Sequence, residues 1–274
     1  MHKRLRTIVL IAVLVATAIA IARSDPRAIG RALAAMSWRW ATIAAVLNLI
    51  GVAIDAMRLR IIVGAEAKVS VWHVIQAQLV GIVGNVLFPF KLGEGARAYV
   101  LTRRQELSTS AAVKMVIADR LIDALVLPIF VVAISVLLPL PERVLRYRGW
   151  MLASAAATSV AIVVVGRHRA RLAAAIGASL ASWTARATIL WCMLRAFDLA
   201  LPLSATVTML VIVNVGIAIV ATPGNVGSFE LASAAALALW NVPSDVAFSV
   251  GIATHLVEVV PPVLLGFAVS MQTS

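Results

Sequence analysis

The stretch LFPFKLGEGAR, residues 87–97, breaks one of the most apolar parts of the chain with a proline, two glycines and three charged side chains. The 274-residue chain is 62% hydrophobic and only 13% charged, so it is more apolar than a soluble protein of this length needs to be. Nearly charge-free runs recur along it, and several approach the roughly 20 residues that span a bilayer as a helix. The sequence therefore predicts an all-α polytopic membrane protein that is interrupted at residues 87–97.

The basic segments decide the predicted topology, because short basic loops tend to stay in the cytoplasm. Four such segments lie at the ends of apolar runs, at residues 3–6, 58–60, 102–104 and 166–171. Full crossings are expected at residues 7–22, 40–58, 114–138, 150–166, 180–198 and 245–268. Placing the four basic segments on one side gives about six full crossings plus two hairpins that enter and leave the membrane on the same side. Both termini then lie in the cytoplasm.

Three further expectations follow from this topology. Residues 7–22 stay attached as an uncleaved anchor, although a signal peptide is the alternative. Residues 27–40 form an amphipathic stretch on the outer surface, with tryptophans at the interface. Basic residues 143–148 lie outside, which is the weak point of the topology.

The two predicted hairpins resemble one another at matched spacing. Their shared features are a proline, glycines and an acidic residue: Pro89, Gly93 and Glu94 in the first hairpin, and Pro223, Gly224, Gly227 and Glu230 in the second. Twenty-five residues after each acid comes another ionisable side chain, Asp119 in the first case and His255 in the second. The single domain 1–274 is therefore predicted to hold two halves, 1–140 and 141–274, that form an inverted repeat of helix, helix, re-entrant hairpin and helix. Chance similarity of two short motifs is the alternative.

Charged side chains inside an apolar helix are functional candidates, because a charge in the bilayer is costly unless it is paired or hydrated. Asp119, Arg120 and Asp123 form such a group. The two aspartates share one helix face, and Arg120 can pair with Asp123. A helix that begins later would instead leave the group at the membrane interface.

Further candidates lie at the hairpin tips and in the last helix. Glu94 and Glu230 stand beside predicted helix N-termini, where carboxylates act either as caps or as functional groups. Arg97 can bind phosphate bidentately, or it can be an ordinary cytoplasmic cation. His255 and Glu258 share a face and are predicted to carry a proton. A metal site would need another ligand, so we predict no metal and no cofactor.

Three stretches carry a family resemblance: NVLFPFKLGEGAR (residues 85–97), ADRLIDAL (118–125) and TPGNVGSFE (222–230). On them the chain resembles the lysylphosphatidylglycerol synthase transmembrane-region family, also called flippase-like integral membrane proteins. The resemblance implies movement of lipids between leaflets, with aminoacylated phosphatidylglycerol as the best-known case. Members that synthesise this lipid carry a soluble acyltransferase domain for which the chain has no room, so synthase activity is not expected.

We therefore expect a lipid flippase or scramblase of a bacterial-type inner membrane, and not an enzyme. The expected pathway residues are Glu94, Arg97, Asp119, Arg120, Asp123, Glu230, His255 and Glu258. The expected partners are anionic or aminoacylated phospholipids or a polyprenyl-linked lipid, with a second copy or a lipid-modifying enzyme as further possibilities. The net charge of +12 suits membrane lipid and is not taken to indicate nucleic acid, since the basic residues cluster at the ends of apolar runs. The alternatives are an accessory subunit that presents lipid to an enzyme, and an intramembrane enzyme, which the lack of a recognisable nucleophile disfavours.

Overall fold

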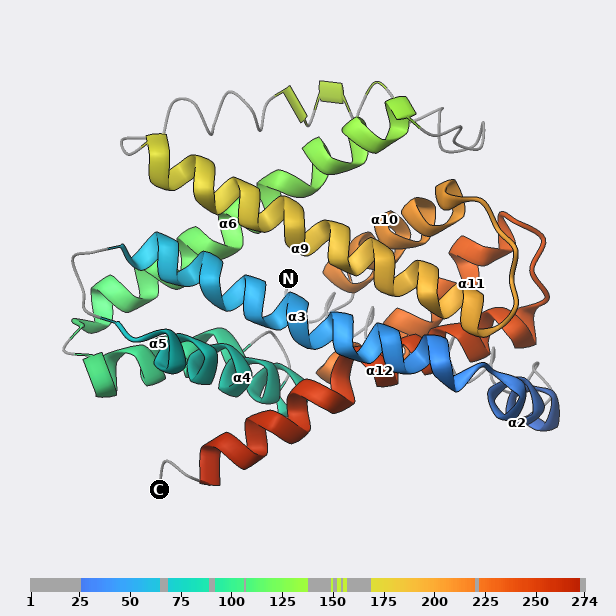
Figure 1. Cartoon of the computed structure of the whole chain (residues 1–274), viewed down its shortest axis with the longest axis horizontal. Coiled ribbons are helices and arrows are strands. Elements are labelled where there is room, and N and C mark those ends of the chain that lie inside the picture. Colours follow the sequence, from blue (N-terminus) through green and yellow to red (C-terminus); the bar gives the residue numbers. More distant parts are fainter. Residues whose placement is uncertain are drawn as a thin grey trace, which may run out of the picture. The chain divides into compact units, whose positions relative to one another are not determined.

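The computed structural model describes residues 26–64, 69–88, 92–105, 107–137, 149, 152–153, 155–156, 169–219 and 222–271. Nine α-helices and one 3₁₀ turn account for most of these residues (Figure 1). They are α2 (Pro26–Ala35), α3 (Trp38–Val63), α4 (Val71–Leu87), α5 (Gly93–Gln105), α6 (Thr109–Leu137), α9 (Arg169–Ala196), α10 (Leu203–Ile219), η1 (Pro223–Asn225), α11 (Ser228–Ala238) and α12 (Ser244–Met271). The predicted all-α fold is confirmed for this part of the chain. The expected helix at 7–22, most of that at 150–166, the basic residues 143–148 and Pro89 lie outside the described residues.

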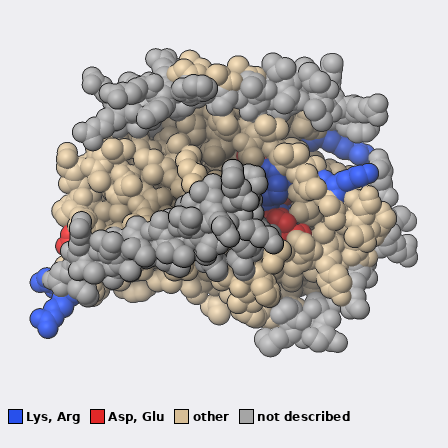
Figure 2. All heavy atoms as spheres, turned by 180° about the vertical axis from the view of Figure 1, so that it is seen from behind, with Lys and Arg blue, Asp and Glu red and all other residues tan. Residues whose placement is uncertain are grey.

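Two of the described helices are long and apolar enough to cross a bilayer, Trp38–Val63 and Ser244–Val269. Each has 26 residues, which corresponds to about 39 Å of helix and exceeds the roughly 30 Å hydrocarbon core. The helices expected at 114–138 and 180–198 are also present, but they begin earlier, at Thr109 and Arg169. Figure 2 shows a face on which the described surface is mostly uncharged, as contact with lipid requires.

Both predicted breaks are confirmed. α4 ends at Leu87 and α5 begins at Gly93, and the helices approach closely because a Cβ atom at Gly84 would lie 2.8 Å from the Cα atom of Gly93. In the second break, Gly224 and Gly227 have φ angles of 58° and 83°, which an L side chain rarely adopts. The inverted repeat and the re-entrant path through the membrane stay predictions.

The chain contains two compact units. The first comprises residues 1–46, 85–91 and 187–260, and the second comprises residues 47–84, 92–186 and 261–274. They are packing units and do not test the predicted halves.

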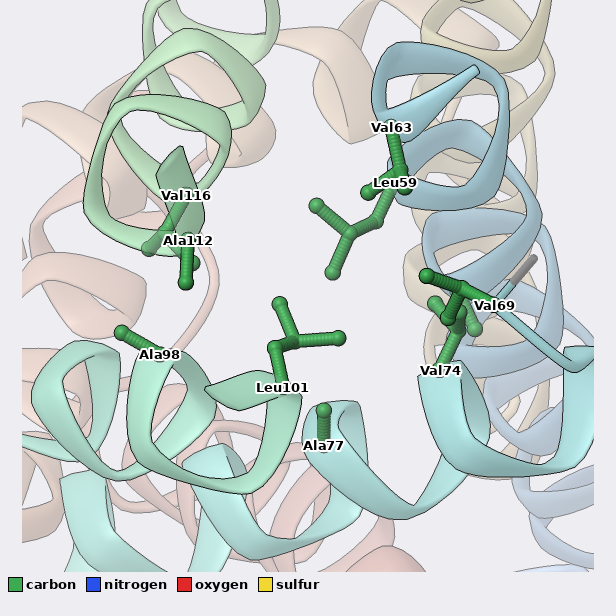
Figure 3. Close-up of a cluster of buried hydrophobic side chains, with 10 residues drawn as sticks. Leu59, Val63, Val69, Val74, Ala77, Ala98, Leu101, Ala112 and Val116 are labelled. Atoms are coloured by element: carbon green, nitrogen blue, oxygen red, sulfur yellow. The ribbon is translucent and has the colours of Figure 1, made fainter. Parts of the chain in front are cut away.

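The second unit has a hydrophobic core that α3, α4, α5 and α6 build together with Val69, in which Leu59 and Leu101 point toward one another and are fully buried (Figure 3). Alanines at positions 77, 98 and 112 of α4, α5 and α6 let these helices approach, as small residues do in membrane proteins.

In the first unit, small residues bring α10, α11 and α12 together. A Cβ atom at Gly216 of α10 would lie 2.8 Å from that of Ala232 in α11. A Cβ atom at Gly251 of α12 would lie 3.1 Å from that of Ser233, also in α11. α11 is therefore packed against a helix on each side, and this arrangement holds the residues of the second break in place.

Candidate functional site

A buried arginine of α3 is the centre of the charged cluster in the second unit. The side chain of Arg58 is 0% exposed. Its Nε atom donates a hydrogen bond of 2.7 Å to Oδ1 of Asp119, and its Nη1 atom donates one of 2.6 Å to Oδ1 of Asp123. The two aspartates lie one turn apart on α6, so a single guanidinium bridges them, and the prediction that they share a face is confirmed. Ser179 of α9 donates a further bond of 3.0 Å to Asp123.

Arg97 joins α5 to the same cluster. Its Nη2 atom donates to Oδ2 of Asp119 over 2.9 Å, and its Nη1 atom donates to Oε2 of Glu94 over 2.9 Å. The carboxylate of Asp119 therefore has a guanidinium on each oxygen. Gly81 of α4 makes room for this contact, because a Cβ atom there would collide with the Cγ atom of Arg97. Arg120 completes the group through an ion pair of 3.1 Å with Glu94, whose geometry is not that of a hydrogen bond.

A further group extends the cluster along α3 and α9. Asp55 accepts hydrogen bonds from Arg186 (2.8 Å) and Ser182 (2.7 Å), and it lies 3.4 Å from Nη1 of Arg58. The guanidinium of Arg186 also lies 5.0 Å from the ring centre of Trp183, which favours a cation–π contact. Four helices, α3, α5, α6 and α9, thus contribute to the cluster.

The charges of this cluster balance. Its basic members are Arg58, Arg97, Arg120 and Arg186, and its acidic members are Asp55, Glu94, Asp119 and Asp123. Four positive and four negative charges sum to zero. Removing one partner of a buried ion pair typically costs about 3–5 kcal/mol, so the fully buried members Arg58, Arg97 and Asp119 depend most on their partners. We call these eight residues the arginine–carboxylate network.

The network keeps unused hydrogen-bond donors. Nη2 of Arg58 and Nε of Arg97 are buried, and neither has an acceptor among the described residues. Both side chains are almost fully buried, at 0% and 1% exposure. A guanidinium offers five N–H groups in a fixed plane, and its strongest partners are carboxylate and phosphate oxygens. The network therefore has the capacity to bind further anionic oxygen atoms.

A second ionisable cluster lies in the first unit, at the break between α10 and α11. Nδ1 of His255 lies 2.6 Å from Oε1 of Glu230, and Nε2 lies 2.8 Å from the carbonyl oxygen of Gly224. The second carboxylate oxygen of Glu230 accepts a bond of 2.7 Å from the N–H of Gly227. The ring of Phe229 stacks on the imidazole at 4.8 Å. Glu230 therefore caps the start of α11 and is bonded to His255, while its functional role stays a prediction.

Two predicted pairings need correction. The acid hydrogen-bonded to His255 is Glu230, which a break in the chain brings close, while Glu258 acts on the imidazole electrostatically. The ion partner of Asp123 is Arg58, because three helices converge there, whereas Arg120 reaches across to Glu94. Sequence spacing identified the correct helix faces and missed these contacts between helices.

Four residues of the network and its support were missed altogether. Arg58 was assigned to a basic cytoplasmic segment, but α3 continues to Val63 and buries it. Asp55, Ser179 and Arg186 are not among the predicted site residues. One signal was present in the sequence, since Asp55 and Arg58 stand three residues apart in a mostly apolar helix, the same spacing as Arg120 and Asp123 in α6.

Within the described ranges, no three His, Cys, Asp or Glu side chains are grouped so that they could hold a metal ion. The acidic side chains of the network are instead bonded to arginines. The chemistry that the site offers is therefore recognition of charged and hydrogen-bonding groups.

Comparison with known protein families gives one match. The model of the lysylphosphatidylglycerol synthase TM region matches residues 7–167 and again residues 164–266, which together cover most of the chain. No curated protein matches the chain.

Proposed function

Because the chain belongs to the lysylphosphatidylglycerol synthase TM region family, and is thus an integral membrane protein, we propose that it is a lipid transporter. It moves a phospholipid or a lipid-linked head group between the leaflets of the inner membrane and does not alter the lipid chemically. The termini lie in the cytoplasm in this proposal.

The observation that carries the proposal is the arginine–carboxylate network. Ionised side chains within a membrane protein are costly, and they are usually retained where a polar substrate must pass. A buried ion pair that served only for stability could often be replaced by apolar residues without loss. Eight such side chains on four helices of an apolar chain therefore favour a functional role.

The chemistry of the network fits a phospholipid head group. The unused donors of Arg58 and Arg97 can bind phosphate oxygens. Carboxylate oxygens accept more than one hydrogen bond each, so those of the network can also accept from an amine on the head group. Anionic, aminoacylated and polyprenyl-linked phospholipids all carry the phosphate that this site would recognise.

Reconstitution into liposomes tests the proposal. Vesicles would contain a fluorescent phospholipid, and an impermeant reductant would quench the label in the outer leaflet. The wild-type protein should let the reductant reach the inner-leaflet label as well. Arg97→Lys should slow this exchange, because lysine keeps the charge but lacks the planar fork.

Lys114→Gln is the matched control, because Lys114 is an exposed cation on α6, the helix of Asp119. It should leave exchange unchanged. If the folded wild-type protein gave no exchange above empty vesicles with any lipid tried, the proposal would be wrong. If the protein bound lipid without exchanging it between leaflets, this result would instead support an accessory subunit that presents lipid to an enzyme.

A further inference from the structure

The end of the chain has an unusual distribution of charge. Arg195 is the last lysine or arginine, and His255 is the one basic side chain in residues 196–274. The acidic side chains in the same range are Asp198, Glu230, Asp245 and Glu258. A buried carboxylate here cannot be neutralised by a guanidinium of the same segment, unlike the carboxylates of the arginine–carboxylate network.

The hydrogen bonds around His255 fix the position of one proton. The carbonyl oxygen of Gly224 can only accept, so Nε2 at 2.8 Å must carry a hydrogen. On the other side of the ring, Nδ1 and Oε1 of Glu230 are 2.6 Å apart. An imidazole lone pair and a carboxylate would repel at this distance, so a proton must lie between them.

Two arrangements satisfy this geometry, an imidazolium beside a carboxylate and a neutral imidazole beside a carboxylic acid. Each contains the same single proton, and in each the pair is neutral. The N–H of Gly227 bonds the other oxygen of Glu230 in both cases. The pair is therefore neutral only when it has bound a proton, whereas the network is neutral because its arginines permanently balance its carboxylates.

Among the described residues of the neighbouring elements, we find no basic group that can take the place of this proton. By sequence, α10 and the turn 222–227 carry none, and α11 carries only Glu230. The residues of α4 beside Gly224, around Val86, are apolar or uncharged. α12 itself contributes Glu258, one turn from His255, and Asp245 in its first turn. Both are acidic, so neither can supply a positive charge in place of the proton.

The proton also supports the contacts that hold the turn between α10 and α11 against α12, and we call this arrangement the closed form of the second break. His255 connects α12 to the turn at Gly224 and to the start of α11 at Glu230, and Phe229 covers the ring. The turn itself lacks regular helical bonding, with positive φ angles at Gly224, Asn225 and Gly227. Loss of the proton to water leaves one negative charge on the pair and removes a bond that ties these elements together.

We propose that Glu230 and His255 form a proton-binding site, and that its proton closes the break between α10 and α11. Release of the proton to water opens the break. If the protein transports lipid, as proposed above, this opening would couple lipid movement to protons. That coupling rests on the proposed function, whereas the site and its proton can be tested without measuring transport.

Nuclear magnetic resonance can detect the proton directly. The protein would be labelled with ¹⁵N-histidine in lipid nanodiscs, and the His255→Gln variant would identify the signals of His255 among the four histidines. We expect a hydrogen on Nε2 and a strongly deshielded proton coupled to Nδ1. At alkaline pH the shared proton alone should be released, leaving a neutral ring that carries one hydrogen. A neutral ring with no shared proton at any pH would overturn the proposal.

Cysteine labelling can detect the opening. Cys192 is the only cysteine, so Cys192→Ala gives a background without thiols. Ser228→Cys would report on the closed break, because Ser228 is buried, and Val226→Cys would be the exposed control at 61%. The ratio of the two labelling rates corrects for ionisation of the thiols. It should rise with pH by at most about tenfold for each pH unit through the transition, as expected for release of one proton, and should level off above it.

Glu230→Gln is the decisive variant, because its amide oxygen can accept from Gly227 and its amide N–H can donate to Nδ1. It mimics the protonated pair, so the ratio should stay low at all pH values. A ratio independent of pH in the wild-type protein, or pH dependence retained in Glu230→Gln, would contradict the proposal. A proton-dependent break in a protein without leaflet exchange would refute the proposed function and support this site.

Discussion

Gly81 offers a sharp test of how the arginine–carboxylate network is built, because it carries no charge and forms no bond of the network itself. It lies on α4, and the side chain of Arg97 passes directly over it. In Gly81→Ala the new Cβ atom would collide with Cγ of Arg97 and would lie 2.6 Å from Cδ and 3.3 Å from the carbonyl oxygen of Gly93. The clash involves the inner part of the arginine side chain, so Arg97 cannot avoid it and still reach Asp119.

The cost can be estimated from two alternatives. If the helices move apart, overpacking of this kind costs about 1–3 kcal/mol. If Arg97 moves instead, the protein loses a charge-assisted hydrogen bond to Asp119, which is worth about 1.5–3 kcal/mol. Either response gives a loss of stability of about 1–3 kcal/mol, and both should slow lipid exchange because they disturb Asp119.

Gly177→Ala is the matched control. Gly177 lies in α9 of the same unit, and no atom lies within 4 Å of a Cβ atom placed there. This variant should be neutral or more stable by up to about 1 kcal/mol, because alanine is the better helix former. Denaturation in mixed micelles and leaflet exchange in liposomes would be measured for both variants. If Gly81→Ala had the same stability and the same rate of leaflet exchange as Gly177→Ala, the conclusion that Arg97 packs closely over α4 would be wrong.

Three further predictions concern single contacts. Glu94→Gln and Arg97→Gln should each lower the free energy of unfolding. Because the two side chains are coupled, the loss in the double variant should be smaller than the sum of the two single losses by about 0.5–3 kcal/mol, as measured by denaturation. Arg58→Lys should cost more than Arg186→Lys, because Arg58 is 0% exposed whereas the side chain of Arg186 is 35% exposed and solvent weakens its ion pair; thermal unfolding compares them. Gly224→Ala should cost about 1–2 kcal/mol in the same assay, because its φ is 58°.

The helical architecture was largely predictable from the sequence. Apolar runs gave the helices, and proline with glycine gave both breaks, because these residues act on the local backbone. The ends of helices were less predictable. α3 continues through Arg58 to Val63, since an arginine can remain helical inside the protein when carboxylates of another helix neutralise it.

The pairings inside the site could not be predicted in the same way. Arg58 lies 61 residues from Asp119 and 65 from Asp123 in the sequence. Helical periodicity indicates which face a side chain shares with its neighbours, but it does not indicate which other helix packs against that face. For the same reason the sequence indicates the local neighbour Glu258 as a partner of His255 and does not indicate the bond to Glu230, which is 25 residues away.

The central claim is that the arginine–carboxylate network receives a lipid head group, and photoaffinity labelling tests it most directly. A phospholipid with a photoreactive group on its head group would be incorporated into vesicles with the wild-type protein, and the labelled peptides would be identified by mass spectrometry. The account predicts labels in α5 and α6, around Arg97 and Asp119, which a competing unlabelled phospholipid removes. Labels confined to exposed apolar positions such as Leu264, with none on α5 or α6, would contradict it.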